Sequence, residues 1–498
     1  MIRLLFLLHR YLGIVVGLVM LIWTVSGIIM MYKVYPELDQ WQKLGLLQNL
    51  DTDSCCQLPA SPAIHSERFS EARIEMLANV PVLRLDSTDR GMVTYSLVDG
   101  QHMEPLDQQQ AAGLAEDFVA RRYPDNRYAF DAQIHNDQWT VYGAYNALRP
   151  LYRYTLDDQA GTQFYLSSQS GEVIQITTRE QRVWGYLGAV IHWLYPTVLR
   201  QHTVLWTQVV IWLTILGIFL TATGLYIGIR QYRNRSNGRI SPYRGLALYH
   251  HYAGLVFGVL TLTWVASGLL SMNPWGTLEG EGMQLEVRRL QERAINWQDV
   301  EGVVAQLSER DVSDYARLQI EVLAGERQIV AHSSSGEAVR LAGTTLQPQA
   351  LSMVALADLS RRLLPGSSIE SQALLTASDR YYYDHHELLE FPIYRVVYDD
   401  AQNRHYYLSP VNGQLVRKID SELRLYRWLF YGIHRGDFSA FLRSRPVWDL
   451  FMVLFLLGVT LVCGTGSYMA IRRVRRDLAL SKYKAESALL YEQSLEEF

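Results

Sequence analysis

Cysteine is scarce in this chain, and the motifs that carry nucleotides or covalently attached cofactors are absent. Three cysteines among 498 residues are too few for a disulfide framework. Cys55 and Cys56 are adjacent, and are either incidental or a vicinal disulfide, while Cys463 lies in an apolar run. There is no CxxC pair, no CxxCH haem-attachment motif, no Walker loop and no GxGxxG. Any cofactor must therefore be held noncovalently.

Charged residues are missing from the middles of four long apolar runs, in a chain that is 49% hydrophobic overall. The runs are Leu4–Met31, Val204–Ile229, Leu246–Met272 and Val447–Ile471. Each exceeds the roughly 20 residues that cross a hydrocarbon core of about 30 Å. The first is longer than the core of a secretion signal and lacks a small-residue cleavage pattern, so we expect it to be retained. The sequence predicts an α-helical integral membrane protein with four transmembrane helices.

Arginines are concentrated at the ends of these runs that would face one side of the membrane. They occur at the start of the first run, between the second and third, and after the fourth: Arg3, Arg10, Arg230, Arg233, Arg235, Arg239, Arg244, Arg472, Arg473, Arg475 and Arg476. Because basic residues next to a span stay in the cytoplasm, we expect both termini and the middle loop to be cytoplasmic. The two long inserts then lie on the far side, which is the periplasm for a bacterial inner-membrane protein.

Each insert combines a helical segment with strand-like segments. Helical periodicity stops before a proline in Ala111–Tyr123 and in Leu351–Leu364. Strand-like alternation and tight-turn pairs follow in both inserts: Leu151–Leu166, Glu172–Thr177 and Tyr394–Leu408, with turns at Ser170-Gly171 and Asn412-Gly413. We expect each insert to form an α+β lobe in which a helix packs on a small antiparallel sheet.

The two halves of the chain match each other at an offset of about 241 residues. The matched segments are His9–Gly13 with Trp23 and Ser26-Gly27 against His250–Gly254 with Trp264 and Ser267-Gly268, Tyr165–Gly171 against Tyr407–Gly413, Ile191-His192 against Ile433-His434, and Trp206 with Thr223-Gly224 against Trp448 with Thr465-Gly466. Because both copies begin on the same side of the membrane, this is a parallel tandem repeat. It predicts pseudo-twofold symmetry about the membrane normal.

The expected organisation has ten segments. They are transmembrane helix 1 (1–32), lobe 1 (33–180), an interfacial helix (181–199), transmembrane helix 2 (203–230), a basic loop (231–245), transmembrane helix 3 (246–272), lobe 2 (273–420), an interfacial helix (421–442), transmembrane helix 4 (447–471) and a cytoplasmic tail (472–498).

Four histidines occupy matched positions near the ends of the spans. His9 and His250 begin the first and third, and His192 and His434 precede the second and fourth. A single histidine at a membrane end is usually interfacial. Two matched pairs at two depths instead favour haem ligation, because facing helices can hold an iron between two imidazoles and ionisable residues in membrane segments tend to be functional.

Some assignments around these histidines stay open. His251 is an alternate to His250, since adjacent helical residues point about 100° apart, and His202 is a weaker alternate without a matched partner. Nearby small residues either pack helices or make room for a flat macrocycle: Gly13, Gly17, Gly224, Gly228, Gly254 and Gly258. Four tryptophans either line a cofactor or anchor the spans in the aromatic belt: Trp23, Trp206, Trp264 and Trp448.

The inserts contain two further candidate features. Asp384-His385-His386-Glu387 has metal-ligand residue types, but the first insert has no equivalent cluster, so a solvated loop is the simpler interpretation. The aromatic-rich stretches 181–199 and 421–442 suit a surface for a bulky organic ligand or amphipathic helices in the membrane interface. We favour the interfacial helices.

With these motifs, the chain resembles the PepSY-associated transmembrane helix family, bacterial inner-membrane proteins often described as iron-regulated. The resemblance rests on Leu8–Gly13 with Trp23 and Ser26-Gly27, on its repeat at His250–Gly268, and on Tyr165–Gly171 leading to Ile191-His192. It spans the whole chain. Among known functions it is most similar to haem-containing ferric-siderophore reductases, which have four spans and two periplasmic PepSY-like lobes.

The resemblance implies two noncovalent haem b groups, one between His9 and His250 and the other between His192 and His434. It also implies reduction of Fe(III) in a periplasmic ferric siderophore, which releases Fe(II). Because no flavodoxin-like domain is fused to the chain, the electron donor would be a quinol or a separate reductase. Membrane lipid is an expected partner, and nucleic acid is not. The alternatives are a non-enzymatic envelope scaffold or sensor and, less favoured, a siderophore or iron transporter.

Overall fold

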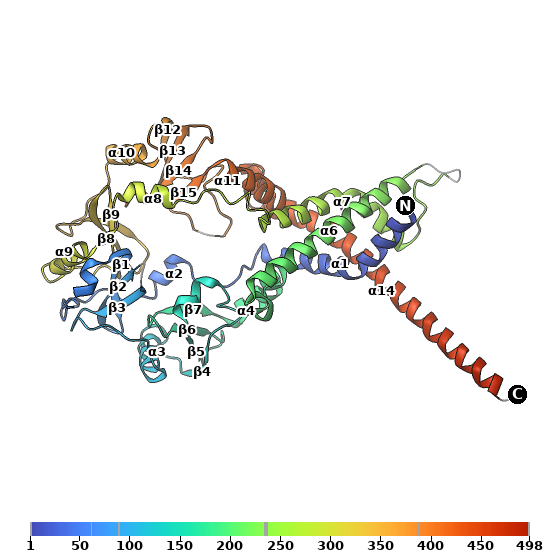
Figure 1. The fold of residues 1–498 in the computed structure, drawn as a ribbon, viewed down its shortest axis with the longest axis horizontal. Helices are drawn as coiled ribbons and strands as arrows, with labels where there is room; N and C mark the ends of the chain where they lie inside the picture. Colours follow the sequence, from blue (N-terminus) through green and yellow to red (C-terminus); the bar gives the residue numbers. More distant parts are fainter. Residues whose placement is uncertain (1, 61, 88–89, 234–237, 387, 497–498) are drawn as a thin grey trace. The chain divides into compact units, whose positions relative to one another are not determined.

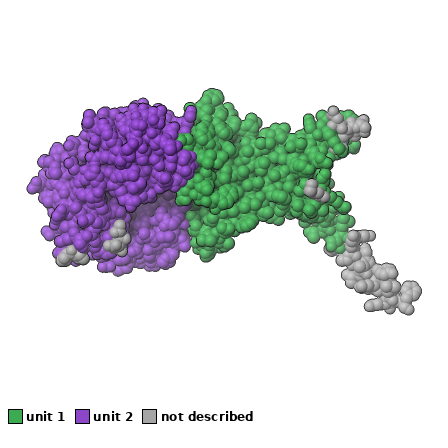
Figure 2. Space-filling model, turned by 45° about the horizontal axis from the view of Figure 1, so that its top comes forward, with its two compact units in different colours: residues 1–35, 184–279, 424–498 green, residues 36–183, 280–423 purple. Residues whose placement is uncertain are grey.

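The computed structural model describes residues 2–60, 62–87, 90–233, 238–386 and 388–496, and side chains of the last helix as far as residue 481 (Figure 1). The chain forms two compact units (Figure 2). The membrane unit comprises residues 1–35, 184–279 and 424–498, and the insert unit comprises residues 36–183 and 280–423. Arg235 of the predicted basic loop lies outside the described residues.

Four long apolar helices make up most of the membrane unit. They are α1 (Ile2–Met30), α6 (Thr203–Gln231), α7 (Leu246–Ser271) and α14 (Val447–Glu496). Each is long and apolar enough to cross a membrane, as predicted. The helix α14 continues well beyond the predicted end of the fourth span, and Arg473 and Asp477 form an i,i+4 ion pair there at 2.9 Å, which favours helix in a polar segment.

These four helices pack as a ring. α1 contacts α6 and α14, and α7 contacts the same two helices. The shared core includes Val16, Met20, Leu220, Trp264 and Val459. Many large apolar side chains on the outer surface are exposed, for example Val15, Val204, Val256, Leu450 and Leu454. An apolar surface of that extent is unusual for a soluble protein and suits contact with lipid.

The first insert contains a four-stranded antiparallel sheet covered by a helix. Its strands, in spatial order, are β4 (Tyr128–Ile134), β5 (Leu151–Leu156), β6 (Gln163–Ser167) and β7 (Val173–Thr177). The helix α3 (Gln108–Arg122) begins at a capping box on Asp107 and buries Ala111, Ala115 and Phe118 against this sheet. The predicted strand Leu151–Leu166 is thus two strands joined by a turn.

The second insert repeats this arrangement. Its sheet is β12 (Ser368–Leu375), β13 (Ile393–Asp399), β14 (His405–Leu408) and β15 (Leu415–Ile419). The helices α8 (Gln284–Gln291) and α10 (Met353–Leu363) contribute Leu290, Leu356 and Leu359 to its core. Asn412-Gly413 joins β14 to β15, as the hairpin prediction required. The predicted strand Tyr394–Leu408 is again divided by a turn.

The inserts are not independent lobes, because their first halves share one sheet. The strand order is β11 (Ala338–Ala342), β10 (Glu326–His332), β9 (Arg317–Leu323), β1 (Arg68–Leu77), β2 (Val80–Ser87) and β3 (Gly91–Ser96), with β8 (Ile295–Asn296) also on β1. Antiparallel pairing of β1 with β9, for example Ile74 opposite Leu318, joins the inserts. This pairing satisfies backbone groups that two separate lobes would leave at open edges. The expectation of one self-contained sheet per insert is corrected accordingly.

The two aromatic-rich stretches are series of short helices rather than two continuous ones. The first contains α4 (Arg179–Gly185), the π-helical η3 (Tyr186–Val190) and α5 (Thr197–Arg200). The second contains α11 (Ser421–Tyr426), the π-helical η4 (Arg427–Gly432), α12 (Ile433–Arg435) and α13 (Ala440–Arg443). In both, a π-helical turn ends directly before the Ile-His pair, and such turns often occur at functional sites.

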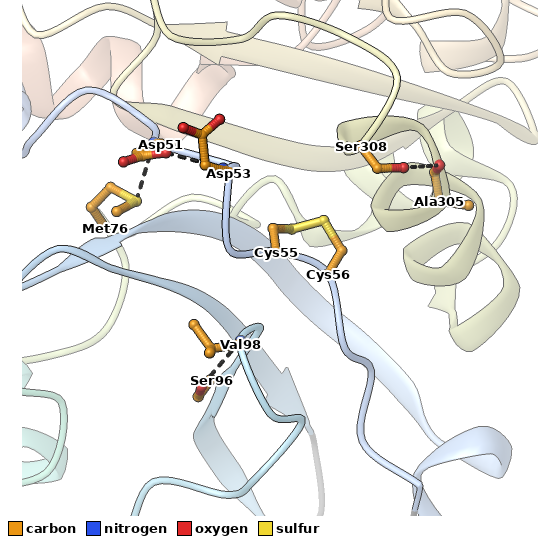
Figure 3. Close-up of a disulfide and its surroundings, with 9 residues drawn as sticks. All are labelled: Asp51, Asp53, Cys55, Cys56, Met76, Ser96, Val98, Ala305 and Ser308. Carbon is orange, nitrogen blue, oxygen red and sulfur yellow. Dashed lines mark hydrogen bonds between the residues drawn. A yellow bond between two sulfur atoms is a disulfide. The ribbon is translucent and has the colours of Figure 1, made fainter.

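Cys55 and Cys56 form a vicinal disulfide in the loop that precedes β1 (Figure 3). Both side chains pack against the core of the shared sheet and of helix α9 (Trp297–Leu307). The backbone N–H of Asp51 in the same loop points to the sulfur of Met76 at 3.4 Å. Of the two alternatives for these cysteines, the structure shows the disulfide.

Glu321 on β9 provides a test of the shared sheet. Its buried carboxyl accepts hydrogen bonds from Gln328 (3.1 Å) and Gln414 (2.5 Å), and burial raises its pKa from 4.5 to about 7. The folded state therefore binds this proton more tightly than the unfolded chain does. Its stability should fall as pH rises from about 4.5 to about 7, by about 3 kcal/mol.

We expect Glu321→Gln to remove this pH dependence. The Tm of the full chain in detergent, measured at about pH 5 and about pH 8, should rise on substitution much more at the higher pH. Glu326→Gln, at an exposed position in the same hairpin, is the matched control. Equal effects of Glu321→Gln at the two pH values would contradict the assignment.

Candidate functional site

His9 on α1 and His250 on α7 face each other inside the membrane unit, with ring centroids 6.4 Å apart. The Nδ1 atom of His9 lies 3.0 Å from the carbonyl oxygen of Leu220 on α6. The Nδ1 atom of His250 lies 3.1 Å from both the carbonyl oxygen of Val462 and the hydroxyl of Thr465 on α14. Each imidazole is thus fixed by a helix other than its own.

His192 and His434 form a second pair with the same construction. Their ring centroids are 6.3 Å apart. The Nδ1 atom of His192 lies 3.0 Å from the carbonyl oxygen of Trp23, and that of His434 lies 3.2 Å from the carbonyl oxygen of Trp264. Ser267 Oγ is also 3.0 Å from Nδ1 of His434.

The partners determine which ring nitrogen carries the proton. A carbonyl oxygen only accepts, so Nδ1 donates in all four histidines. The hydroxyls of Ser267 and Thr465 already donate to helix carbonyls, so they too accept from the rings. Within the described part of the chain no Nε2 atom of these four histidines has a hydrogen-bond partner. This tautomer, with Nδ1 bonded to the main chain and a lone pair on Nε2, is able to ligate a metal through Nε2.

Each imidazole lies against a glycine placed four residues after the carbonyl that fixes it. The carbonyl and glycine positions are Leu220 and Gly224, Val462 and Gly466, Trp23 and Gly27, and Trp264 and Gly268. A Cβ atom on Gly224 would be 2.5 Å from Cε1 of His9, and one on Gly466 would be 3.0 Å from Cε1 of His250. The absence of a side chain lets the ring reach the carbonyl.

The two pairs fit axial ligation of a haem iron. Metal–imidazole bonds of about 2.0 Å on opposite sides of one metal place the two ring centroids roughly 6 Å apart, close to the observed 6.4 and 6.3 Å. One turn after His9 and His250, a Cβ atom on Gly13 or Gly254 would meet nothing within 4 Å. That open space is suited to a flat macrocycle beside this pair.

The alternative ligand candidates His251 and His202 do not share this geometry. Both ring nitrogens of His251 have partners, Ser241 Oγ at 2.8 Å and the carbonyl of Gly228 at 2.9 Å. Its Nε2 must donate to that carbonyl and has no lone pair for a metal. His202 is exposed at the start of α6, and its ring contacts Gln201 rather than another histidine.

A protein-family model described as the PepSY-associated TM region matches residues 6–473, which include both inserts, all of α6 and α7, and most of the other two candidate spans. The chain belongs to this family. No curated protein matches it. Family membership and four apolar helices together identify this PepSY-associated TM protein as a multi-pass membrane protein.

The Asp384–Glu387 cluster is only partly described. The rings of His385 and His386 lie 6.4 Å apart, and Glu387 is outside the described residues. Among the residues that the structure does describe, no group of three or more His, Cys, Asp or Glu side chains is arranged to hold a metal ion. A haem needs only two axial ligands, so this observation concerns bare metal ions and not the histidine pairs.

Trp206 and Trp448 have a role that the sequence did not indicate. The indole N–H of Trp206 donates to the carbonyl of Trp193 at 3.0 Å, and that of Trp448 donates to the carbonyl of Arg435 at 2.7 Å. In both cases the acceptor directly follows the paired histidine. The spacing of fourteen residues from histidine to tryptophan is the same in both halves of this PepSY-associated TM protein, and is the signal that could have revealed it.

Two glycine substitutions test the contact that fixes His9. Gly224→Ala places a methyl group against the ring, so we expect destabilisation by about 1–3 kcal/mol, although alanine favours a helix by about 1 kcal/mol. Gly254→Ala meets open space and should leave the stability unchanged or raise it. The measurement is the Tm of each variant in detergent. Equal shifts of Tm in the same direction for the two variants would argue against the close His9–Gly224 contact.

Proposed function

We propose that this protein is an inner-membrane haem b electron-transfer protein that reduces Fe(III) held by a periplasmic siderophore and so releases Fe(II) for uptake. The observation that carries the proposal is the two histidine pairs, each with Nδ1 bonded to a main-chain carbonyl, Nε2 without a partner and ring centroids 6.3–6.4 Å apart. A haem bound between two imidazoles cycles between Fe(III) and Fe(II) and passes single electrons.

The positions of the two histidine pairs along α1 support electron transfer across the membrane. The pair His9–His250 involves residue 9 of α1, whereas His192 bonds to Trp23 of the same helix. Fourteen residues of helix correspond to ~21 Å, a large part of a hydrocarbon core of about 30 Å. The matched contacts of the two pairs also support the pseudo-twofold tandem repeat.

The direction of the proposed electron transfer follows from the positions of the arginines. Arg230 lies in the last turn of α6 and Arg233 follows that helix, and Arg472 and Arg473 follow the apolar part of α14. These are the helix ends nearest the His9–His250 pair. Arginine-rich ends face the cytoplasm, so we assign electron entry to His9 and His250 and exit to His192 and His434. The inserts then lie in the periplasm. Without a nucleotide-binding motif in the chain, the donor is a quinol or a separate reductase.

The chain's own residues would bind the haem groups and orient the imidazoles that hold them. The carbonyls of Leu220, Val462, Trp23 and Trp264 hold the imidazoles in the ligating tautomer. The buried bundle around Trp264 and Leu220 excludes water from the space between the helices. One electron converts Fe(III) to Fe(II), which hard oxygen chelators bind less tightly, and no proton from these residues is required.

The reduced-minus-oxidised visible spectrum of detergent-purified protein, with pyridine-haemochrome quantitation, is the primary test. We expect about two b-type haems per chain. His434→Ala or His192→Ala should reduce this to about one, because the His9–His250 pair stays intact. His202→Ala, which removes an exposed histidine, should retain both. Protein from haem-replete cells that carries no haem would disprove the proposal and favour the envelope scaffold or sensor.

Reductase activity needs a separate assay. In proteoliposomes with a reduced quinol in the membrane and a ferric hydroxamate outside, formation of Fe(II), trapped by a ferrous chelator, should depend on His434. Loss of reduction in His434→Ala, with the haem at His9–His250 retained, is the expected result. A wild-type protein that carries haem but does not reduce the chelate would transfer electrons to another acceptor.

A further inference from the structure

We propose that the insert unit contains a second binding site, a cavity that takes a small organic carboxylate between the shared sheet, α3 and the β6–β7 turn. The cavity has a volume of about 270 Å³. Its lining includes Lys43 of α2 (Gln40–Leu44), Arg73 and Glu75 of β1, Glu172 of the turn and Arg317 of β9. This site is independent of the histidine pairs and stands whether or not the protein binds haem.

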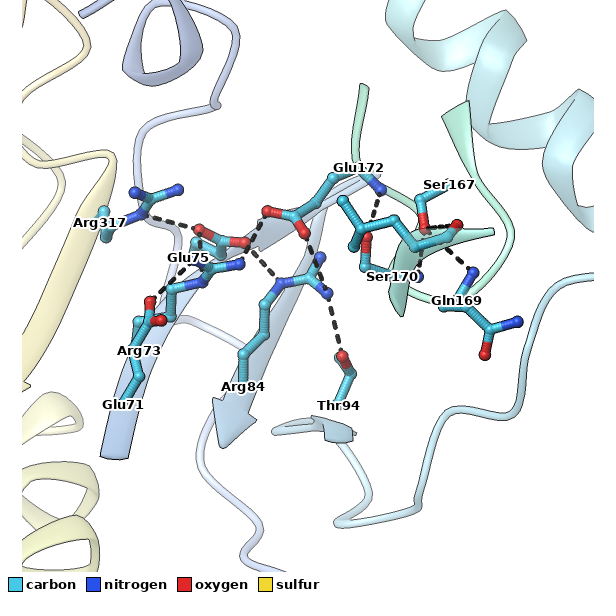
Figure 4. A network of polar contacts seen from close by, with 11 residues as sticks. Glu71, Arg73, Glu75, Arg84, Thr94, Ser167, Gln169, Ser170, Glu172 and Arg317 are labelled. Carbon is cyan, nitrogen blue, oxygen red and sulfur yellow. Dashed lines mark hydrogen bonds and ion pairs between the residues drawn. The ribbon is translucent and has the colours of Figure 1, made fainter. Parts of the chain in front are cut away.

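A buried ionic network forms one wall (Figure 4). Glu75 is 0% exposed and Arg84, on β2, is 1% exposed. The carboxylate of Glu75 lies 2.5 Å from Arg84 Nε, 3.0 Å from Arg317 Nε and 3.7 Å from Arg73 Nε. Burial alone would raise the pKa of Glu75, but the three guanidinium groups outweigh it and lower the pKa to about 2. Glu75 therefore stays ionised and holds the arginines in place.

The residues around the cavity leave hydrogen-bond donors unused. Arg317 donates only through Nε, so the two terminal nitrogens of its guanidinium have no partner among the described residues. The ammonium group of Lys43 likewise has none there. Because a guanidinium fork and an ammonium group together suit a carboxylate, these donors define the charged end of the ligand.

The charge of the lining agrees with an anionic ligand. Five basic side chains face three acidic ones around the cavity: Lys43, Arg73, Arg84, Arg121 and Arg317 against Glu75, Asp117 and Glu172. The lining also has an apolar part, which includes Leu114, Phe118 and Leu166. A ligand with one carboxylate and a compact apolar body matches both parts of the lining. The volume lies below the usual range of about 300–1,000 Å³ for ligand pockets, which favours a small molecule.

The second insert shows that the matched turn forms without a charged residue after its glycine. Gly171 and Gly413 occupy the matched turns, with φ of 72° and 75°, and a Cβ atom on either would contact leucine side chains. Glu172 follows the first glycine, whereas the uncharged Gln414 follows the second. Gln414 bonds to Glu321 of β9 and not to an arginine. The same turn thus forms without an ion network, so the charged network serves a purpose other than folding the turn.

Calorimetric titration of the full chain in detergent tests the site. The probes are benzoate and hexanoate, with benzamide as an uncharged analogue and sulfate as an inorganic anion. We expect both carboxylates to bind and to raise the Tm, and benzamide to fail. Binding of neither carboxylate would overturn the proposal, as would sulfate binding as tightly as benzoate.

Three variants locate the binding. Lys43→Met changes an exposed side chain outside the ion network and should weaken benzoate binding about tenfold, ~1.4 kcal/mol. Arg317→Leu should weaken it by at least as much, and its Tm without ligand reports any loss of fold. Arg340→Gln, on β11 and outside the lining, is the control that should keep wild-type affinity. Wild-type affinity in Lys43→Met and Arg317→Leu would overturn the assignment of the cavity.

Discussion

The membrane unit depends on hydrogen bonds from histidine rings to main-chain carbonyls inside a helical bundle. A helix carbonyl is normally shielded by the side chain four residues later, which lies over the same groove of the helix. Glycine at that position, as in Leu220–Gly224 and Val462–Gly466, opens the groove. The ring then enters and donates through Nδ1, while its Nε2 has no hydrogen-bond partner among the described residues. One constraint thereby fixes ring orientation, proton position and close helix approach.

The sequence predicted the spans and the histidine pairing because both depend on patterns that survive without three-dimensional information. Long apolar runs identify membrane helices, and matched positions such as His9 and His250 indicate which residues face each other. The carbonyls that orient the rings could not be predicted, since every residue has one. The sequence identifies the glycines only as small residues, because their contact with a ring depends on the rotation of each helix about its axis.

The shared sheet was missed for a different reason. β1 and β2 contain charged residues on buried positions, namely Glu75 and Arg84, and this breaks the apolar alternation that identifies strands. A buried carboxylate is tolerated there because three arginines surround it, and two of these come from neighbouring strands. The pairing of β1 with β9 joins residues more than 240 positions apart. No local pattern specifies a contact over such a distance.

The two histidine pairs reach the same tautomer by different structural routes, and this difference bears on how rigid each is. His9 and His250 lie on long continuous helices, and a Cβ atom on their glycines would be 2.5 and 3.0 Å from the rings, whereas a Cβ atom on the glycines beside His192 and His434 would be 3.3 and 3.8 Å away. The latter pair directly follows π-helical turns and lies at the ends of helical segments much shorter than α1 and α7. There the indole hydrogen bonds of Trp206 and Trp448 hold the carbonyl after each histidine. The tryptophans therefore supply at the second pair the restraint that a continuous helix supplies at the first.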